Sequence, residues 1–294
     1  YAYGDKYMKK TLRMGDLLEL DAPSVQHRLK VIIDSKNLVL ENVYNQEPLS
    51  YDEIMEWCRS QAEFFKDYIC DVGTLLGAAA DQGKNILFEA QLGALRDIDY
   101  GIYPFTSSSN TIASYAPIGA GIPGRALDNV VGVMKAYSTC VGEGPFAAEK
   151  AMGEAWNEKL RESGGEFGAA TGRPRRVGPF DAVASRYGIR CQKAQDIALT
   201  KLDVLGAFDK IPVITGYRLH GVLLDSFPTD SRLEEAEPVI EELPGWGCDI
   251  SGCRSWKELP ENARKYVCTL EKLVDHPIYL VSTGAERDAY LLRE

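Results

Sequence analysis

The sequence predicts an α/β protein with a mixed, mostly parallel sheet surrounded by helices. Short apolar runs at residues 85–90, 196–203 and 277–282 end in polar residues, as buried strands do. Segments with helical periodicity alternate with these runs, and the chain has no internal repeat. The 294 residues are 45% hydrophobic and 26% charged, a composition that suits a globular protein with a sizeable core.

Composition also restricts the classes of function. A formal net charge of -10 argues against a broad nucleic-acid surface and against binding to anionic membranes. No apolar run has the length of a membrane span, and no signal-peptide pattern opens the chain. Seven scattered cysteines indicate reduced thiols rather than a zinc site or a disulfide framework, so we expect a cytoplasmic protein.

Residues 1–84 form a mainly helical part. A helical stretch opens at Gly15–Leu20 and continues to Leu29, a second covers 52–68, and a third covers 72–82 and ends at Gly83. Apolar residues in the second stretch recur every three or four positions, and we expect them in the core rather than around a cofactor.

Residues 85–294 form the α/β part, which begins with the strand at 85–90. Glu89, Asp97 and Asp99 near its end could form an acid–base pair, although pairing with Arg96 or holding turns is the favoured interpretation. The hydroxyl-rich segment 106–111 could bind a phosphate or cap the next helix.

The remaining elements follow in order. We predict helices at 127–138, 147–161, 181–187, 233–242 and 260–274, a hairpin at 211–224 around His220–Gly221, and strands at 196–203 and 277–282, the latter being the last. Asp181 is the expected cap of its helix. Ligands of open α/β sheets bind at the carboxyl ends of strands, which places Thr200–Asp203 beside a ligand.

The arginine loop, residues 165–178, has a composition that stands apart from the acidic chain. Pro174 fixes its own φ and favours extended backbone at Arg173, so Arg173 and Arg175 point one way and Arg176 the other. The loop could deliver two guanidinium forks to an anion, or its arginines could pair with nearby acids.

Seven segments together resemble one family, and they occur in the family's order. They are FEAQLGALRDIDYGIYPFTSSSN, KAYSTCVGEGPF, GEFGAATGRPRRVG, ALTKLDVL, LPGW, LPENARKYV and VSTGAER. The chain resembles adenylosuccinate synthetase over nearly its whole length. The resemblance implies a P-loop-NTPase-like fold and a GTP-dependent C–N ligase of purine (AMP) biosynthesis that joins IMP and L-aspartate through a 6-phosphoryl-IMP intermediate. It also implies a magnesium ion and a homodimer.

The resemblance assigns residues to three ligands. For IMP it implies Lys9, Gln91, Leu92, Thr106, Ser107 and Arg173. For aspartate it implies the loop Ala169, Ala170, Thr171, Gly172, Arg173, Pro174 and Arg175. For GTP it implies Arg175, Lys201, Leu202, Asp203, Ser282, Thr283 and Gly284. Asp203 would accept hydrogen bonds from the guanine N1–H and 2-amino group, which adenine lacks.

The sequence departs from the family pattern at several positions. Leu92 stands where the family often has glutamine, Lys9 where it has an arginine that acts across the dimer, and Ala170 where a threonine is common. No GDEGKGK-type phosphate loop occurs in the 294 residues. We therefore expect a single, N-terminally truncated domain that lacks its first strands, its catalytic residues and its magnesium ligands, and that is inactive alone. The alternative is a non-catalytic nucleotide-binding or dimer-forming module.

Overall fold

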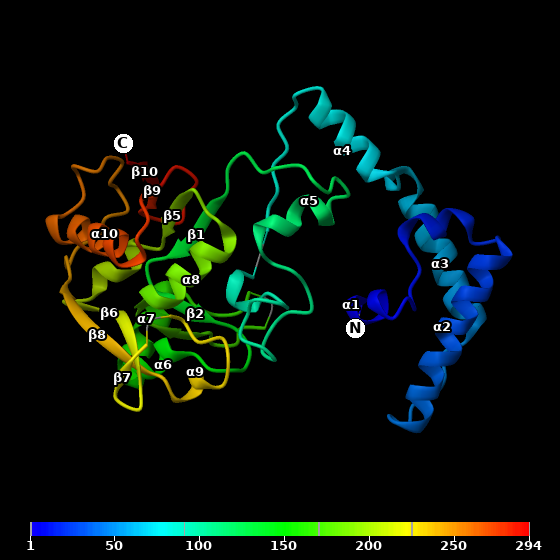
Figure 1. Ribbon diagram of the computed structural model, residues 1–294, viewed down its shortest axis with the longest axis horizontal. Coiled ribbons are helices and arrows are strands. Elements are labelled where there is room, and N and C mark those ends of the chain that lie inside the picture. Colours follow the sequence, from blue (N-terminus) through cyan, green and yellow to red (C-terminus); the bar gives the residue numbers. More distant parts are fainter. Residues whose placement is uncertain (1, 91, 170, 225, 294) are drawn as a thin grey trace. The chain divides into compact units, whose positions relative to one another are not determined.

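The chain forms two compact units in the computed structural model, which describes residues 2–90, 92–169, 171–224 and 226–293 (Figure 1). The first unit comprises Tyr1–Leu87 with Ile118–Gly124, and the second comprises Phe88–Pro117 with Arg125–Glu294.

The first unit is helical. Its elements are α1 (Ala2–Tyr7), the 3₁₀ helix η1 (Met14–Glu19), α2 (Pro23–Asn42), α3 (Tyr51–Phe65), η2 (Lys66–Tyr68) and α4 (Val72–Asp81). Ser50 and Asp71 cap α3 and α4 by accepting hydrogen bonds from backbone N–H groups in their first turns. The helical prediction for 15–29 is corrected, because η1 is separate and α2 starts afresh with Pro23 in its first turn.

The expected core position of the apolar residues in segment 52–68 is wrong for most of its aromatic side chains. Met55 and Cys58 are buried against residues of α2, whereas Trp57, Phe64 and Tyr68 are exposed. Positions two apart on a helix lie about 200° apart around its axis. Burying Met55 therefore turns Trp57 towards the surface.

The main sheet of the second unit has four strands in the order β1 (Val131–Lys135), β5 (Asp196–Thr200), β9 (Ile278–Ser282) and β10 (Tyr290–Leu292). The first three are parallel, and β10 runs antiparallel to β9. Lys135 lies opposite Thr200 in the β1–β5 register. The carboxyl ends of three strands therefore meet at one edge of this sheet, as the predicted fold class requires (Figure 1).

Smaller sheets and helices complete this unit. A second sheet contains β4 (Phe180–Asp181), β6 (Lys210–Leu219), β7 (Val222–Leu223) and β8 (Glu237–Pro244), and β2 (Ser138–Cys140) pairs with β3 (Arg176–Gly178). The helices are η3 (Ala94–Arg96), η4 (Ala113–Tyr115), α5 (Ala116–Gly119, at a unit boundary), α6 (Ala147–Ala151), α7 (Glu154–Gly164), α8 (Ala182–Gln192), η5 (Asp203–Ala207), α9 (Arg232–Glu235) and α10 (Glu261–Val274).

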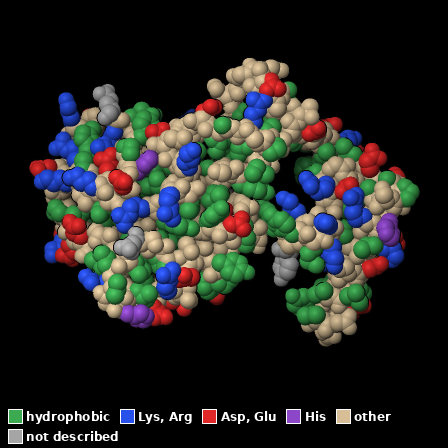
Figure 2. Space-filling view, in the orientation of Figure 1, with side chains coloured by type: hydrophobic (Ala, Val, Ile, Leu, Met, Phe, Trp, Pro, Cys, Tyr) green, Lys and Arg blue, Asp and Glu red, His purple; other side chains and the backbone are tan. Residues whose placement is uncertain are grey.

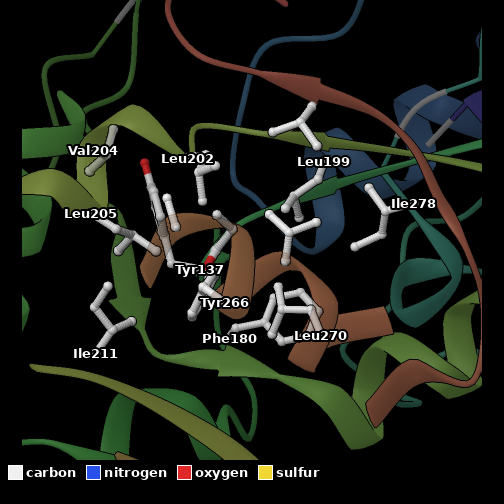
Figure 3. Close-up of a cluster of buried hydrophobic side chains, with 14 of the residues drawn as sticks. Tyr137, Phe180, Leu199, Leu202, Val204, Leu205, Ile211, Tyr266, Leu270 and Ile278 are labelled. Carbon is white, nitrogen blue, oxygen red and sulfur yellow. Dashed lines mark hydrogen bonds between the residues drawn. The ribbon is translucent and has the colours of Figure 1, made fainter. Parts of the chain in front are cut away.

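The largest core cluster lies between the main sheet and α10. Figure 3 shows Leu199 and Ile278 of the sheet in one cluster with Leu270 of α10. Tyr137 lies on the other side of this cluster, towards Leu202 and Leu205. The Tyr266 hydroxyl donates to the Ala136 carbonyl at 2.7 Å, so this buried polar group is satisfied. The core thus packs α10 against the main sheet, and the strand ends of that sheet form the site.

Several predicted elements need correction. Residues 85–90 form no strand, and the boundary between the two units falls within them. Segment 127–138 contains β1 and the start of β2 instead of a helix, and 233–242 contains the end of α9 and most of β8. The predicted helix 147–161 breaks between α6 and α7 at Gly153, and β10 follows the strand expected to be last.

Other predictions are confirmed. Asp181 caps α8 by accepting from the Ala184 N–H at 3.0 Å, and β6 and β7 turn through His220 and Gly221, both with positive φ. No helix in the described parts of the chain could span a bilayer. On the face shown in Figure 2, acidic and basic side chains are interspersed.

Candidate functional site

Three strand ends define the site. Lys135 ends β1, Lys201 directly follows β5, and Ser282 ends β9. Lys201 has a φ of 63°, in the left-handed region, and its Nζ donates to the Gly164 carbonyl at 2.7 Å. This turn leads directly into η5, which starts at Asp203. The structure thus brings the two segments that the resemblance assigns to GTP, 201–203 and 282–284, to one edge of the sheet.

A buried carboxylate, Glu166, lies at this edge. Its Oε1 accepts from Lys135 Nζ at 2.8 Å and from the Tyr137 hydroxyl at 2.6 Å, and its Oε2 accepts from an Arg175 guanidinium nitrogen at 2.8 Å. Burial alone raises the pKa of Glu166, but the hydrogen bonds from Lys135, Tyr137 and Arg175 outweigh it and lower the pKa below its usual value. Glu166 and these three partners are called the Glu166 cluster below.

Burial and neighbouring charges shift the pKa values of groups in and beside the Glu166 cluster. The pKa of Lys135 is lowered, chiefly by burial and then by the positive charges of Arg175 and Lys201, although Glu166 opposes the shift. Burial raises the pKa of Asp203, and the charge of Lys201 opposes that rise. Three cations therefore accompany Glu166 and Asp203, which is an environment that suits a further anion.

The arginine loop is a tight hairpin, and the described residues of its tip are 169, 171 and 172. Its neck is closed by a hydrogen bond from the Gly168 N–H to the Arg173 carbonyl at 2.8 Å and by an antiparallel bridge between Phe167 and Pro174. Gly172, with a φ of 63°, permits the turn. The bridge places Pro174 in a strand-like pairing, while the extended backbone expected at Arg173 stays a prediction.

The three arginines of the loop differ in their surroundings. Arg175 pairs with Glu166, and Arg176 donates two hydrogen bonds to Glu149 at 2.8 and 2.6 Å. The neighbouring side chains therefore point to different carboxylates, as extended backbone requires. Arg173 is exposed, and its guanidinium has no partner among the described residues. Two arginines thus pair with acids, and one remains open to a ligand.

A cavity of about 770 Å³ lies beside β1. Its lining includes Leu92, Thr106, Ser107, Lys135, Thr139 and Asp181. The Arg96 guanidinium donates to the carbonyls of Phe105 and Val141, which ties the segment containing Thr106 and Ser107 to the turn after β2. The hydroxyls of Thr106 and Ser107 in this lining are groups that can donate to a phosphorylated ligand.

Comparison with known proteins identifies the family. The family model for adenylosuccinate synthetase matches residues 1–291. The chain belongs to the adenylosuccinate synthetase family. It is 44% identical to the adenylosuccinate synthetase of Pelobacter propionicus over 291 residues and 46% identical to that of Trichlorobacter lovleyi over 291 residues. These matches cover 99% of this chain and 67% and 66% of the relatives, so the chain spans about two thirds of their length.

A solved structure agrees with this assignment. The structure of fully ligated adenylosuccinate synthetase from Plasmodium falciparum matches with a TM-score of 0.90 at 32% sequence identity. The match covers 99% of this chain and 68% of that one. The predicted fold class of the adenylosuccinate synthetase family is therefore confirmed.

The residues that the family resemblance assigned to ligands lie in different parts of the structure. Leu92, Thr106 and Ser107 line the cavity, Arg175 joins the Glu166 cluster, and Lys201 and Asp203 lie beside that cluster. Lys9 belongs to the first unit, and Gln91 and Ala170 lie outside the described residues.

Two of the residues assigned to GTP are buried. Leu202 belongs to the core cluster, and the Thr283 hydroxyl donates to the Cys253 carbonyl at 3.1 Å. Their backbones are also used within the fold, because the Thr283 N–H donates to the Ala289 carbonyl at 2.8 Å and the Leu202 carbonyl accepts from the Leu205 N–H at 3.2 Å. Ser282 keeps its hydroxyl on the Gly284 carbonyl at 2.9 Å, which shapes the turn after β9.

Sequence reasoning missed the Glu166 cluster. Glu166 lies within the quoted segment GEFG and Lys135 within KAYST, but neither has a spacing that predicts the contact. Asp97 is not an acid–base candidate, because it is fully buried and accepts from the N–H groups of Asp99, Tyr100 and Thr111. The interpretation that it holds turns is confirmed.

Proposed function

We propose that the protein to which this chain belongs is a GTP-dependent ligase of purine nucleotide biosynthesis. It joins IMP and L-aspartate to adenylosuccinate and releases GDP and phosphate. One observation carries the proposal: in a member of the adenylosuccinate synthetase family, the arginine loop and the predicted guanine-reading segment meet at the carboxyl edge of the main sheet. A cytoplasmic homodimer, with Lys9 completing the partner's site, remains part of the proposal.

Each ligand has a proposed location. IMP occupies the cavity, with the hydroxyls of Thr106 and Ser107 on its phosphate. The tip of the arginine loop receives aspartate, whose carboxylate pairs with Arg173. GTP lies across the ends of β5 and β9, with Asp203 on the base and Ser282–Gly284 along it. Arg175 reaches from the Glu166 cluster to both aspartate and GTP.

Magnesium requires donors that the described residues do not provide. No group of three or more His, Cys, Asp or Glu side chains that could hold a metal ion occurs in the parts of the chain that the structure describes. The described residues therefore do not fit the ion. The described side chains bind and orient substrates in this proposal.

Asp203 carries a prediction about base selectivity. Asp203→Asn should weaken GDP binding to the 294-residue chain and leave ADP binding unchanged, because an amide offers only one acceptor to the two guanine donors. A hydrogen bond to a charged group contributes about 1.5–3 kcal/mol, or about tenfold to hundredfold in affinity. The raised pKa of Asp203 adds a pH dependence: affinity for GDP falls as the pH is lowered through that pKa, since the ionised form accepts both bonds.

Isothermal titration calorimetry with GDP and ADP measures this effect. Asp209→Asn is the matched control, because Asp209 is exposed and lies just beyond η5. Equal affinities of the Asp203→Asn variant and the unsubstituted chain for GDP would show that Asp203 does not read the base.

Turnover by the chain alone is a separate prediction. The 294 residues contain no phosphate-loop motif, so we expect the chain to bind nucleotides without forming adenylosuccinate from IMP, GTP and aspartate. Chromatographic assay of the reaction mixture checks this. Steady accumulation of adenylosuccinate would place the γ-phosphate machinery within these residues, and the proposal that the catalytic groups lie elsewhere would be wrong.

A further inference from the structure

Glu166 is a buried ionised group to which the reaction assigns no role. We propose that Glu166 is a positioning residue: it fixes Arg175 at the carboxyl edge of the sheet so that the remaining guanidinium nitrogens face the anionic ligand. This inference rests on the proposed function, because it assigns a ligand-facing role to Arg175.

The contacts of Arg175 support a positioning role for Glu166. The Arg175 backbone N–H donates to the Glu166 carbonyl at 2.9 Å, and its own carbonyl accepts from Arg161 Nε at 3.0 Å. Its side chain uses one terminal nitrogen on Glu166. The backbone and one side of the guanidinium are thus held, whereas Nε and the second terminal nitrogen have no partner among the described residues.

The two side chains of the Glu166–Arg175 pair differ in burial. The Glu166 side chain is 0% exposed, whereas that of Arg175 is 34% exposed. Arg175 is therefore the partly exposed member of the pair, and its unpaired nitrogens are available to a ligand. A planar fork held on one side loses little further rotational freedom when it binds an anion on the other.

The neighbouring arginine provides a contrast within the same chain. Arg176 directs Nε and one terminal nitrogen to Glu149 and the other to the carbonyls of Gly142 and Gly144. All three nitrogens of Arg176 are therefore used within the protein. The Glu149–Arg176 pair holds the fold, whereas the Glu166–Arg175 pair leaves donors for a ligand.

The two oxygens of Glu166 explain why a carboxylate is needed. One accepts from Lys135 and Tyr137 and the other from Arg175, so every contact is made by an acceptor. A glutamine of the same shape has one acceptor and one donor. Whichever way its amide is oriented, an N–H group faces either Arg175 or the pair formed by Lys135 and Tyr137. The glutamine variant therefore releases part of the cluster without removing volume.

Titration of GDP into the 294-residue chain tests the inference. Glu166→Gln should weaken binding by about tenfold or more, and Glu149→Gln, the matched control, by less than about threefold. In an Arg175→Leu background the Glu166→Gln substitution should have no further effect on affinity, because a positioning residue acts through the group that it holds. Thermal unfolding of all variants separates binding from stability.

A further variant covers the case in which Glu166→Gln fails to fold. Arg175→Lys keeps a positive partner for Glu166 but presents no second nitrogen, so the inference expects a stable chain with the same loss of GDP affinity. Undiminished GDP binding in either folded variant, or additive effects of Glu166→Gln and Arg175→Leu, would overturn the positioning role alone. Absence of GDP binding by the unsubstituted chain would overturn the proposed function, and the positioning role with it.

Discussion

Arg173→Leu should weaken the binding of adenylosuccinate by about 2–5 kcal/mol. Adenylosuccinate carries both aspartate carboxylates on the nucleotide, so its affinity reports on the tip of the arginine loop. A carboxylate entering this site loses water and needs a charged partner in fixed geometry. The exposed Arg173 has its backbone carbonyl fixed by the Gly168 N–H and no side-chain partner among the described residues, so its guanidinium is free for this contact.

Calorimetric titration with adenylosuccinate measures the effect. Arg186→Leu is the matched control, because Arg186 is an exposed arginine on α8 outside the lining of the cavity. Arg176 is a poor control, since its bonds to Glu149 and two carbonyls hold the fold. Equal losses in the Arg173 and Arg186 variants would mean that the loop provides only general positive charge.

Leu270→Ala should lower the free energy of unfolding by about 2–5 kcal/mol. Leu270 of α10 is fully buried among residues of the main sheet (Figure 3). Truncating it removes apolar contact on the helix that supports the strand ends, and leaves a cavity that the packed core fills only partly. Urea denaturation followed by circular dichroism measures the change.

Lys272→Ala provides the control on the same helix. Lys272 is exposed, so its truncation should change the free energy of unfolding by less than about 0.5 kcal/mol. A loss at Leu270 no larger than the loss at Lys272 would show that α10 contributes little to holding the sheet.

Local signals in the sequence predicted local structure well. Signals a few residues apart in the sequence are enough to predict Asp181 with its helix, the turn at His220–Gly221, and α10. β8 was mistaken for a helix because its partner is β6, and nothing within residues 233–242 carries that pairing. β1 was missed for the same reason, since its partner β5 lies far along the chain.

The candidate site was likewise predictable only where local sequence signals determine it. The ligand position after β5 was predictable, because strand ends in α/β sheets place residues such as Lys201 in a known relation to the sheet. The Glu166 cluster was not, because Lys135 and Tyr137 precede Glu166 by 31 and 29 positions and meet it only when β1 and the arginine loop are folded. Tertiary contacts between charged residues leave no periodic pattern in a sequence.

The outer edge of β1 affects how the chain behaves in concentrated solution. β1 pairs only with β5 among the described strands, and its Val131 and Val133 are 51% and 71% exposed. Unpaired backbone groups beside exposed valines offer a template on which strands of other molecules can add. We therefore expect aggregation of the purified chain to begin at this strand, despite a net charge of -10, and a single charged side chain at position 131, which does not line the cavity, to improve solubility more than the same charge placed elsewhere.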